Sequence, residues 1–179
     1  MGLKTILFTG GSGLLSLNWA LRLRFGCRII LILHSRHILV DGCELVYASL
    51  NDLEELDRLF TYYQPDVVIH TAAITDVEKC EQYPEQAKIV NVDFSATIAN
   101  CCFKHKCKLV YISTDHLFDG KDKFMREIDE VIPPNVYAKT KSDAESVVLY
   151  QCPDALVIRT NFFGWGPKYR VSFSDWIVS

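Results

Sequence analysis

Short apolar runs alternate along the chain with segments of helical periodicity. The runs predict strands at residues 5–9, 28–33, 44–47, 66–70, 109–113 and 156–159. Between them, apolar side chains recur every three or four positions, which predicts helices. These helical patterns comprise Leu14, Leu17 and Leu21; Leu53, Leu56 and Phe60; and Ala87, Val90, Phe94 and Ile98.

The predicted strands are apolar on both faces, as in the runs 29–33 and 67–69. A strand of this kind is covered by helices on each side, so the alternation predicts an α/β fold with a Rossmann-like, doubly wound parallel sheet. Asn51 followed by Glu54 resembles a capping box, which predicts the start of the second helix. No internal repeat or linker divides the 179 residues, and we expect one domain over 1–179.

Composition excludes several classes of protein. With 49% hydrophobic residues, 23% charged residues and a net charge of −3, the chain is neither disordered nor strongly basic, so nucleic acid is not an expected partner. The apolar run 29–33 is too short to span a membrane. The N-terminus leads directly into glycines and does not resemble a signal peptide, which predicts a cytoplasmic protein. The seven cysteines form no paired spacing, so we expect reduced thiols and no metal.

Charge is unevenly distributed. Residues 1–40 contain five basic side chains and no acidic one, which leaves 14 basic and 22 acidic residues for the remainder. We therefore expect the first part of the chain to hold an anion.

A glycine-rich turn, TGGSGLL at residues 9–15, separates the first predicted strand from the first helix. Glycines at such a turn let the backbone approach a pyrophosphate, and the helix that follows offers free N–H groups. The alternative is a plain tight turn, but the position after an N-terminal strand favours dinucleotide binding.

The second predicted strand is followed by His34-Ser35-Arg36-His37. An acidic residue at this place usually binds a ribose 2′-hydroxyl, whereas arginine suits a 2′-phosphate. The sequence therefore predicts NADP(H), with NAD(H) as the alternative, and Arg36 as the phosphate contact. The other interpretation is that Arg36 is a solvated loop residue.

Two further motifs contain polar side chains suited to catalysis. Tyr137 and Lys141 lie four residues apart in a predicted helix and so share a face, where an ammonium would lower the pKa of the phenol. Ser113 and Thr114 lie at the exit of the fifth strand, where ligands bind in sheets of this type. Either motif alone also fits a surface helix or a strand end.

Taken together, the motifs resemble the extended short-chain dehydrogenase/reductase family, and within it the dTDP-4-dehydrorhamnose reductases and related nucleotide-sugar reductases. The segments that carry the resemblance, in family order, are TGGSGLL (9–15), PDVVIHTAA (65–73), VEKCE (77–81) with the Asn91-Val92 pair, STDHLFDG (113–120), NVYAKTKSDAE (135–145) and IRTNFFGWG (158–166).

The resemblance implies reduction of a sugar C4 ketone by NADPH. In that reading Tyr137 donates the proton, Lys141 lowers the pKa of Tyr137 and holds the nicotinamide ribose, and Thr114 binds the reacting oxygen. Asp115 and Phe162 would contact substrate. The cofactor contacts would be Gly10, Gly13, Leu14, Leu15, Ser49, Leu50, Ala72 and Ala73, together with Tyr137 and Lys141.

Several positions depart from the family pattern. Ser16 replaces the third glycine of the turn, Ser49 stands where many relatives have Asp, and His116 replaces the Tyr of rhamnose reductases and the Glu of dehydratases. The absence of that Glu favours reduction over dehydration.

Relatives also continue past residue 166 into a C-terminal lobe, so the substrate lobe is expected to be largely missing. We further expect a homodimer. Two alternatives to the reductase remain open, a non-catalytic NADP-binding regulatory subunit and an inactive truncated product.

Overall fold

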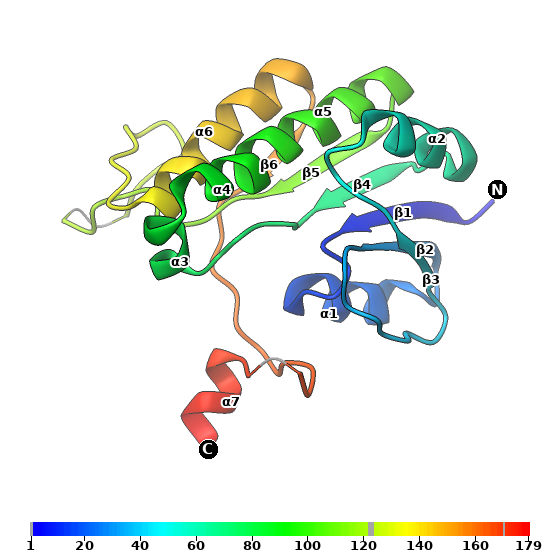
Figure 1. The fold of residues 1–179 in the computed structure, drawn as a ribbon, viewed down its shortest axis with the longest axis horizontal. Helices are drawn as coiled ribbons and strands as arrows, with labels where there is room; N and C mark the ends of the chain where they lie inside the picture. Colours follow the sequence, from blue (N-terminus) through cyan, green and yellow to red (C-terminus); the bar gives the residue numbers. More distant parts are fainter. Residues whose placement is uncertain (1, 122–123, 170) are drawn as a thin grey trace.

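The computed structural model describes residues 2–121, 124–169 and 171–179, with the backbone alone at 173. Within them, six parallel strands form one sheet in the order β3-β2-β1-β4-β5-β6 (Figure 1). The strands are β1 (Lys4–Thr9), β2 (Cys27–Leu33), β3 (Glu44–Tyr47), β4 (Val67–His70), β5 (Lys108–Ile112) and β6 (Leu156–Ile158). The Rossmann-like parallel sheet predicted from the sequence is confirmed.

Helices cover both faces of the sheet. The helical elements are α1 (Leu14–Leu23), α2 (Leu53–Tyr63), α3 (Val77–Gln82), α4 (Pro84–Lys88), the π-helix η1 (Ile89–Asp93), α5 (Phe94–His105), α6 (Val136–Gln151) and α7 (Phe173–Val178). In Figure 1, α2, α5 and α6 lie above the sheet and α1 lies below it. The terminal helix α7 lies on the α1 side, at the end of an extended segment that leaves β6.

Two hydrophobic clusters fill the space between the sheet and the helices. Because strand side chains alternate, Leu7 of β1 enters the cluster under α2, α5 and α6, whereas Ile6 and Phe8 enter the cluster on the α1 side. Leu7 and Phe8 are both fully buried. This explains why the strand sequences are apolar on both faces.

Each predicted strand matches an observed one within one residue at either end. The predicted capping box is wrong: Asp52, not Asn51, caps α2, and its carboxylate accepts a hydrogen bond from the Glu55 backbone N–H at 2.9 Å. Asp52 directly precedes the first helical residue, Leu53, so its carboxylate is the one within reach of the free N–H groups.

The basic character of residues 1–40 is largely neutralised in the fold. Lys4 pairs with Asp66 at 2.8 Å, Arg28 with Glu44 at 2.6 Å, and Arg24 with Asp41 at 3.4 Å. Strand pairing brings Asp66 beside β1 and Glu44 beside β2, whereas Asp41 reaches the end of α1 from the loop before β3. Three of the five basic side chains of residues 1–40 are thus paired with acids, and the expectation that this part of the chain holds an anion stays a prediction.

The order of the strands reverses between β1 and β4, and this reversal positions the site. From β1 the chain crosses over to β2 and β3 on one side, and from β4 it crosses over to β5 and β6 on the other. This divergence opens a crevice at the carboxyl ends of the strands. In the described part of the chain, no helix is long and apolar enough to cross a membrane.

Candidate active site

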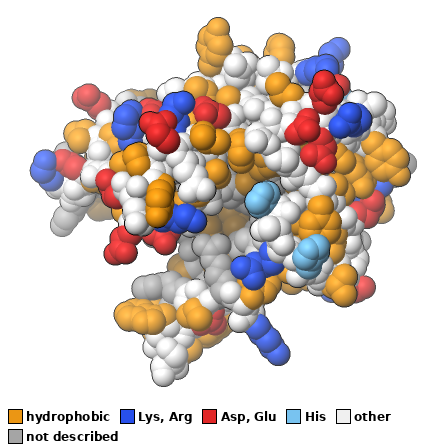
Figure 2. All heavy atoms as spheres, viewed as in Figure 1, with side chains coloured by type: hydrophobic (Ala, Val, Ile, Leu, Met, Phe, Trp, Pro, Cys, Tyr) orange, Lys and Arg blue, Asp and Glu red, His pale blue; other side chains and the backbone are white. Residues whose placement is uncertain are grey.

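A cavity of about 890 Å³ lies at the carboxyl end of the sheet. It is lined by residues that follow each of the six strands, and Figure 2 shows the surface hollowed between the main body and the C-terminal segment. The lining includes most of the residues expected to bind cofactor or substrate: Gly10, Gly13, Leu14, Leu15, Ser49, Leu50, Ala72, Ala73, Thr114, Asp115, Tyr137 and Phe162. Two expected site residues, Arg36 and Lys141, are not part of this lining.

The glycine turn brings the backbone to the floor of the cavity. Gly10 has φ +65°, and a Cβ there would lie 2.9 Å from the backbone of Ala72. A Cβ on Gly13 would lie 3.1 Å from the Gly10 carbonyl oxygen. A side chain is thus excluded at Gly10 and crowded at Gly13, which lets a pyrophosphate approach the backbone N–H groups at the start of α1.

Ser16 replaces the third glycine of the turn without disturbing the packing of α1. Its side chain is fully buried, and its Oγ lies 2.7 Å from Thr71 Oγ1. Because Thr71 donates its own proton to the Thr9 carbonyl at 2.7 Å, Ser16 is the donor to Thr71. The serine therefore ties α1 to the residue that follows β4.

A buried hydrogen-bond chain runs beneath the turn through His70. Ser95 Oγ donates to the Asn91 carbonyl at 2.6 Å, so it accepts from His70 Nε2 at 2.9 Å. His70 Nδ1 then accepts from Thr9 Oγ1 at 2.6 Å. Burial lowers the pKa of His70 to about 3, which keeps the imidazole neutral and fixes this order of donors.

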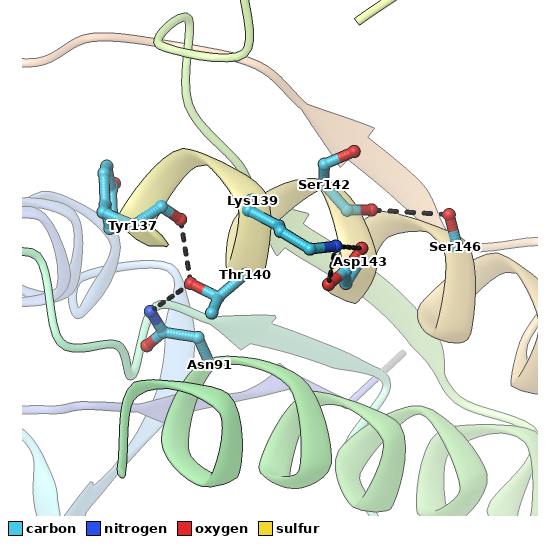
Figure 3. A network of polar contacts seen from close by, with 7 residues as sticks. All are labelled: Asn91, Tyr137, Lys139, Thr140, Ser142, Asp143 and Ser146. Atoms are coloured by element: carbon cyan, nitrogen blue, oxygen red, sulfur yellow. Dashed lines mark hydrogen bonds and ion pairs between the residues drawn. The ribbon is translucent and has the colours of Figure 1, made fainter. Parts of the chain in front are cut away.

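Asn91 connects this chain to the helix that carries Tyr137 (Figure 3). Its side-chain oxygen accepts from the Ile74 backbone N–H at 2.8 Å, and its Nδ2 donates to Thr140 Oγ1 at 3.0 Å. Thr140 Oγ1 in turn donates to the Tyr137 carbonyl at 2.8 Å. Asn91 lies in the π-helix η1 and is fully buried. Its position fixes the first turn of α6 relative to the loop after β4.

Asn91 was not predicted as a site residue. The sequence does contain a signal, since a lone amide between Val90 and Val92 would be buried among apolar side chains and needs hydrogen-bond partners. The identity of those partners depends on η1. π-helical turns occur frequently at functional sites.

Tyr137 is half-buried at the wall of the cavity, close to Thr114. Burial raises the pKa of the Tyr137 phenol, and a side-chain hydrogen bond with Thr114 acts in the opposite direction. The expectation that Lys141 lowers this pKa is not met in the structure, where Lys141 makes no contribution to it. The phenol is therefore protonated at neutral pH, as a proton donor must be.

Lys141 extends into the protein instead of into the cavity. Its side chain is 4% exposed, its Nζ donates to the Ile112 carbonyl at 2.7 Å, and the ammonium lies 4.2 Å from the ring centre of Tyr111. Burial lowers the pKa of Lys141 to about 7, and the charge of Glu145 opposes that shift. Sharing a helix face with Tyr137 thus does not bring the two functional groups together.

The loop after β5 supplies the remaining polar groups of this wall. Thr114 is 3% exposed, and its Oγ1 accepts a hydrogen bond from the His116 backbone N–H at 3.2 Å. The His116 ring packs edge-on against Tyr137 with centroids 6.3 Å apart, and His116 Nε2 lies 4.0 Å from Asp115 Oδ1. An exposed imidazole and a carboxylate therefore adjoin the phenol at the cavity.

The opposite end of the cavity is formed by the loops after β2 and β3. His34 lines it, as does Ser49, whose backbone N–H donates to Glu55 Oε2 at 3.0 Å. Arg36 is exposed just beyond this lining, with its guanidinium 4.3 Å from the ring centre of Tyr169. This end has the space and polar groups to hold an adenosine moiety.

Further lining residues were not predicted from the sequence. They lie in the loops after β2, β3 and β4, on α4 and η1, and in the segment that follows β6; examples are His34, Asn51, Thr71, Gln86, Asn161, Phe163 and Pro167. These residues share a position after a strand or at a helix end. Which of these positions meet at one cavity depends on the order of the strands in the sheet. Among the described residues, no group of three or more His, Cys, Asp or Glu side chains is arranged to hold a metal ion. All seven cysteines are free thiols.

Comparisons with known proteins agree with this geometry. Residues 4–169 match the family described as the RmlD substrate binding domain. A probable low-salt glycan biosynthesis reductase of Haloferax volcanii is 34% identical over 177 residues, which is 96% of this chain and 58% of that protein. Methionine adenosyltransferase 2 subunit beta of Pongo abelii is 36% identical over 111 residues, covering 62% of this chain and 33% of that protein.

Solved structures show the same fold. A hypothetical dTDP-4-dehydrorhamnose reductase of Sulfolobus tokodaii has a TM-score of 0.78 and 32% identity, over 88% of this chain and 55% of that one. A Bacillus anthracis dTDP-4-dehydrorhamnose reductase in complex with NADP has a TM-score of 0.69 and 20% identity, over 89% of this chain and 54% of that one. A Bordetella bronchiseptica enzyme in complex with NAD has a TM-score of 0.78 and 22% identity, over 91% of this chain and 55% of that one.

The chain thus spans little more than half the length of the first of these relatives and of the solved structures that it matches. The family match covers the glycine turn, the polar loop after β5 and the helix with Tyr137. The chain belongs to the family described as the RmlD substrate binding domain.

Proposed function

We propose that residues 1–179 form the NADP(H)-binding Rossmann domain of a nucleotide-sugar reductase, which reduces the 4-keto group of a nucleotide-linked deoxysugar. The observation that carries the proposal is the placement of Thr114 and Tyr137 in the same cavity as the glycine turn. A dinucleotide with its pyrophosphate at Gly10 would extend along this cavity toward the phenol. Relatives named as reductases support the same reaction.

The cofactor would supply a hydride to the C4 carbon of the sugar. The chain's own groups would supply the rest: Thr114 Oγ1 donates a hydrogen bond to the carbonyl oxygen, and Tyr137 transfers its phenolic proton to that oxygen as charge develops there. The raised pKa of Tyr137 keeps this proton in place until the substrate is bound. Asp115 and Phe162 would contact the sugar at the open side of the cavity.

Lys141 would act in this scheme through charge and position. Its ammonium is anchored to the Ile112 carbonyl, two residues before Thr114. With a pKa of about 7, it carries a partial positive charge at neutral pH. A turn of the side chain toward the cavity would bring that charge to the nicotinamide ribose, the role that family resemblance implies.

The experiment that tests the proposal follows NADPH absorbance in the presence of a dTDP-4-keto-6-deoxy sugar. Wild-type chain is expected to consume NADPH. Tyr137→Phe removes the proton donor and is expected to lower kcat by about 10²-fold to 10⁴-fold. Tyr150→Phe, on the exposed end of the same helix, is the matched control. NADPH consumption that is equal in wild type and Tyr137→Phe would contradict the assignment.

A second candidate is a non-catalytic NADP-binding regulatory subunit. Two observations favour it: Lys141 points away from the cavity, and the chain is 36% identical over 111 residues to methionine adenosyltransferase 2 subunit beta. A regulatory subunit needs the glycine turn but has no need for Tyr137. It would bind NADPH and show no turnover with the keto-sugar.

A further inference from the structure

Arg24, Arg28 and Arg36 each lie over an aromatic ring, and they differ in whether a carboxylate also pairs with the guanidinium group. Arg24 and Arg28 direct their guanidinium groups at carboxylates, Asp41 and Glu44. For Arg36, no carboxylate within 4 Å occurs among the described residues; its guanidinium lies over an aromatic ring, 4.3 Å from the centre of Tyr169.

A guanidinium group that stacks on an aromatic ring contacts the ring through one face of its plane. The five N–H donors lie in that plane and point outward along its edges. Stacking therefore fixes the direction of Arg36 without using the donors, whereas a carboxylate pair would occupy two of them. An arginine held in this way is prepared to bind a planar or tetrahedral oxyanion with two parallel hydrogen bonds.

Tyr169 is itself attached to the glycine turn. Its hydroxyl donates to the Ser12 carbonyl at 2.9 Å, although the two residues are 157 positions apart in sequence. Ser12 lines the cavity, as do Gly166 and Pro167 shortly before Tyr169. The ring thus holds Arg36 at a fixed place beside the turn, at the end of the cavity bounded by His34 and Ser49.

We propose that Tyr169 is a specificity-determining residue, which selects a 2′-phosphorylated dinucleotide by holding Arg36 over its ring beside the glycine turn. This rests on the proposed function, because it assumes that the cavity binds a nicotinamide dinucleotide. The proposal adds Tyr169, from the segment after β6, to the residues expected at the 2′-phosphate. A 2′-phosphate is a dianion that meets a preorganised donor edge, whereas a free 2′-hydroxyl gains little from it.

The test measures direct binding, without turnover. NADPH and NADH are titrated separately into the wild-type chain and into Tyr169→Leu, Tyr169→Phe and Tyr150→Leu, with energy transfer from protein tryptophan to the nicotinamide as the readout. Tyr169→Leu is expected to weaken NADPH binding by about tenfold and to leave NADH binding within about twofold. Tyr169→Phe keeps the ring and loses the bond to Ser12, so an intermediate loss of about threefold is expected for NADPH.

A double-mutant cycle separates this role from a merely structural one. In Arg36→Leu, the further change Tyr169→Leu is expected to have no additional effect on the NADPH affinity. Equal weakening of NADPH and NADH by Tyr169→Leu would overturn the inference, as would a wild-type chain that binds both with the same affinity. A wild-type chain that binds neither dinucleotide would refute the proposed function itself. Tyr150→Leu, an exposed tyrosine on α6, is expected to match wild type in both titrations.

Discussion

The burial of Lys141 determines both its position and its pKa. Its ammonium is enclosed between the Ile112 carbonyl and the ring of Tyr111, and burial lowers its pKa to about 7. An unfolded chain would bind a proton at this lysine up to a pH of about 10.5. Between pH 7 and 10.5 the unfolded state therefore binds more protons at this lysine than the folded state, and this group makes the free energy of unfolding rise with pH.

This sign leads to a prediction for Lys141→Met, which keeps the side-chain length and removes the charge. The free energy of unfolding of wild type, relative to the variant, is expected to increase by about 2 kcal/mol from pH 7 to pH 9. Urea unfolding at the two pH values measures it. Lys139→Met, an exposed lysine on the same helix, is the control and is expected to show no such change. A difference between wild type and Lys141→Met that stays constant with pH would refute the assigned environment.

Sequence spacing predicts which residues lie at the cavity, but it does not predict where a long side chain points. Gly10, Thr114 and Tyr137 line the cavity, and each of these positions follows directly from a strand end or a helix start that the sequence predicts. Spacing also places Lys141 on the same helix as Tyr137, but the direction of a long aliphatic stem depends on which acceptor lies within reach. Here that acceptor is the Ile112 carbonyl of a neighbouring strand, which no local pattern reveals.

At the scale of elements, α6 is held to the sheet by an ion pair as well as by apolar packing. Arg159, just past β6, forms two parallel hydrogen bonds with Glu145 of α6, from Nε to Oε1 at 3.0 Å and from Nη2 to Oε2 at 2.7 Å. The side chains are 23% and 10% exposed. The pair fixes the helix that carries Tyr137 against the strand that leads to the C-terminal segment.

Glu145→Gln is expected to lower the free energy of unfolding by about 2 kcal/mol, because it leaves a partly buried guanidinium without its counter-charge. The matched control is Asp143→Asn, which breaks the exposed pair with Lys139 on the same helix and is expected to cost less than about 0.5 kcal/mol. Thermal or urea unfolding of the two variants at neutral pH provides the comparison. Equal effects would show that the Arg159 pair contributes no more than a surface contact.

Elements were the most predictable level of the structure. The four central strands, β2, β1, β4 and β5, were found because they are largely buried between the two helical layers, so that apolar residues are continuous along them. The edge strands β3 and β6 are only half-buried and were found as short apolar runs. The segment from Ala87 to Ile98 was predicted as one helix and instead contains α4, η1 and α5. Apolar spacing of three and four residues does not distinguish α-helical from π-helical hydrogen bonding. The π-helical turn η1 contains the buried Asn91, which bonds to Ile74 and Thr140.

At the scale of the whole molecule, the sheet order turns separate loops into one cavity. The reversal between β1 and β4 and the parallel direction of all strands bring the glycine turn, the loop after β5 and the segment after β6 to a common edge. The uneven charge of the sequence did not predict this arrangement, because three of the early basic residues are paired in the fold with acids from later in the sequence. Arg36 lies on Tyr169, a contact over more than 130 positions that periodicity does not encode.

We propose that this cavity brings a hydride donor to the C4 carbon of a nucleotide-linked keto-sugar beside Tyr137. The most direct test of this proposal incubates the chain with NADPH that carries deuterium on the transferable position of C4 of the nicotinamide ring, together with a dTDP-4-keto-6-deoxy sugar, and analyses the sugar by mass spectrometry and NMR. Deuterium is expected at C4 of the reduced sugar, with its rate of appearance lowered by about 10²-fold or more in Tyr137→Phe. NADPH that binds to the chain but leaves the sugar unlabelled would refute the reductase proposal and would favour a regulatory subunit.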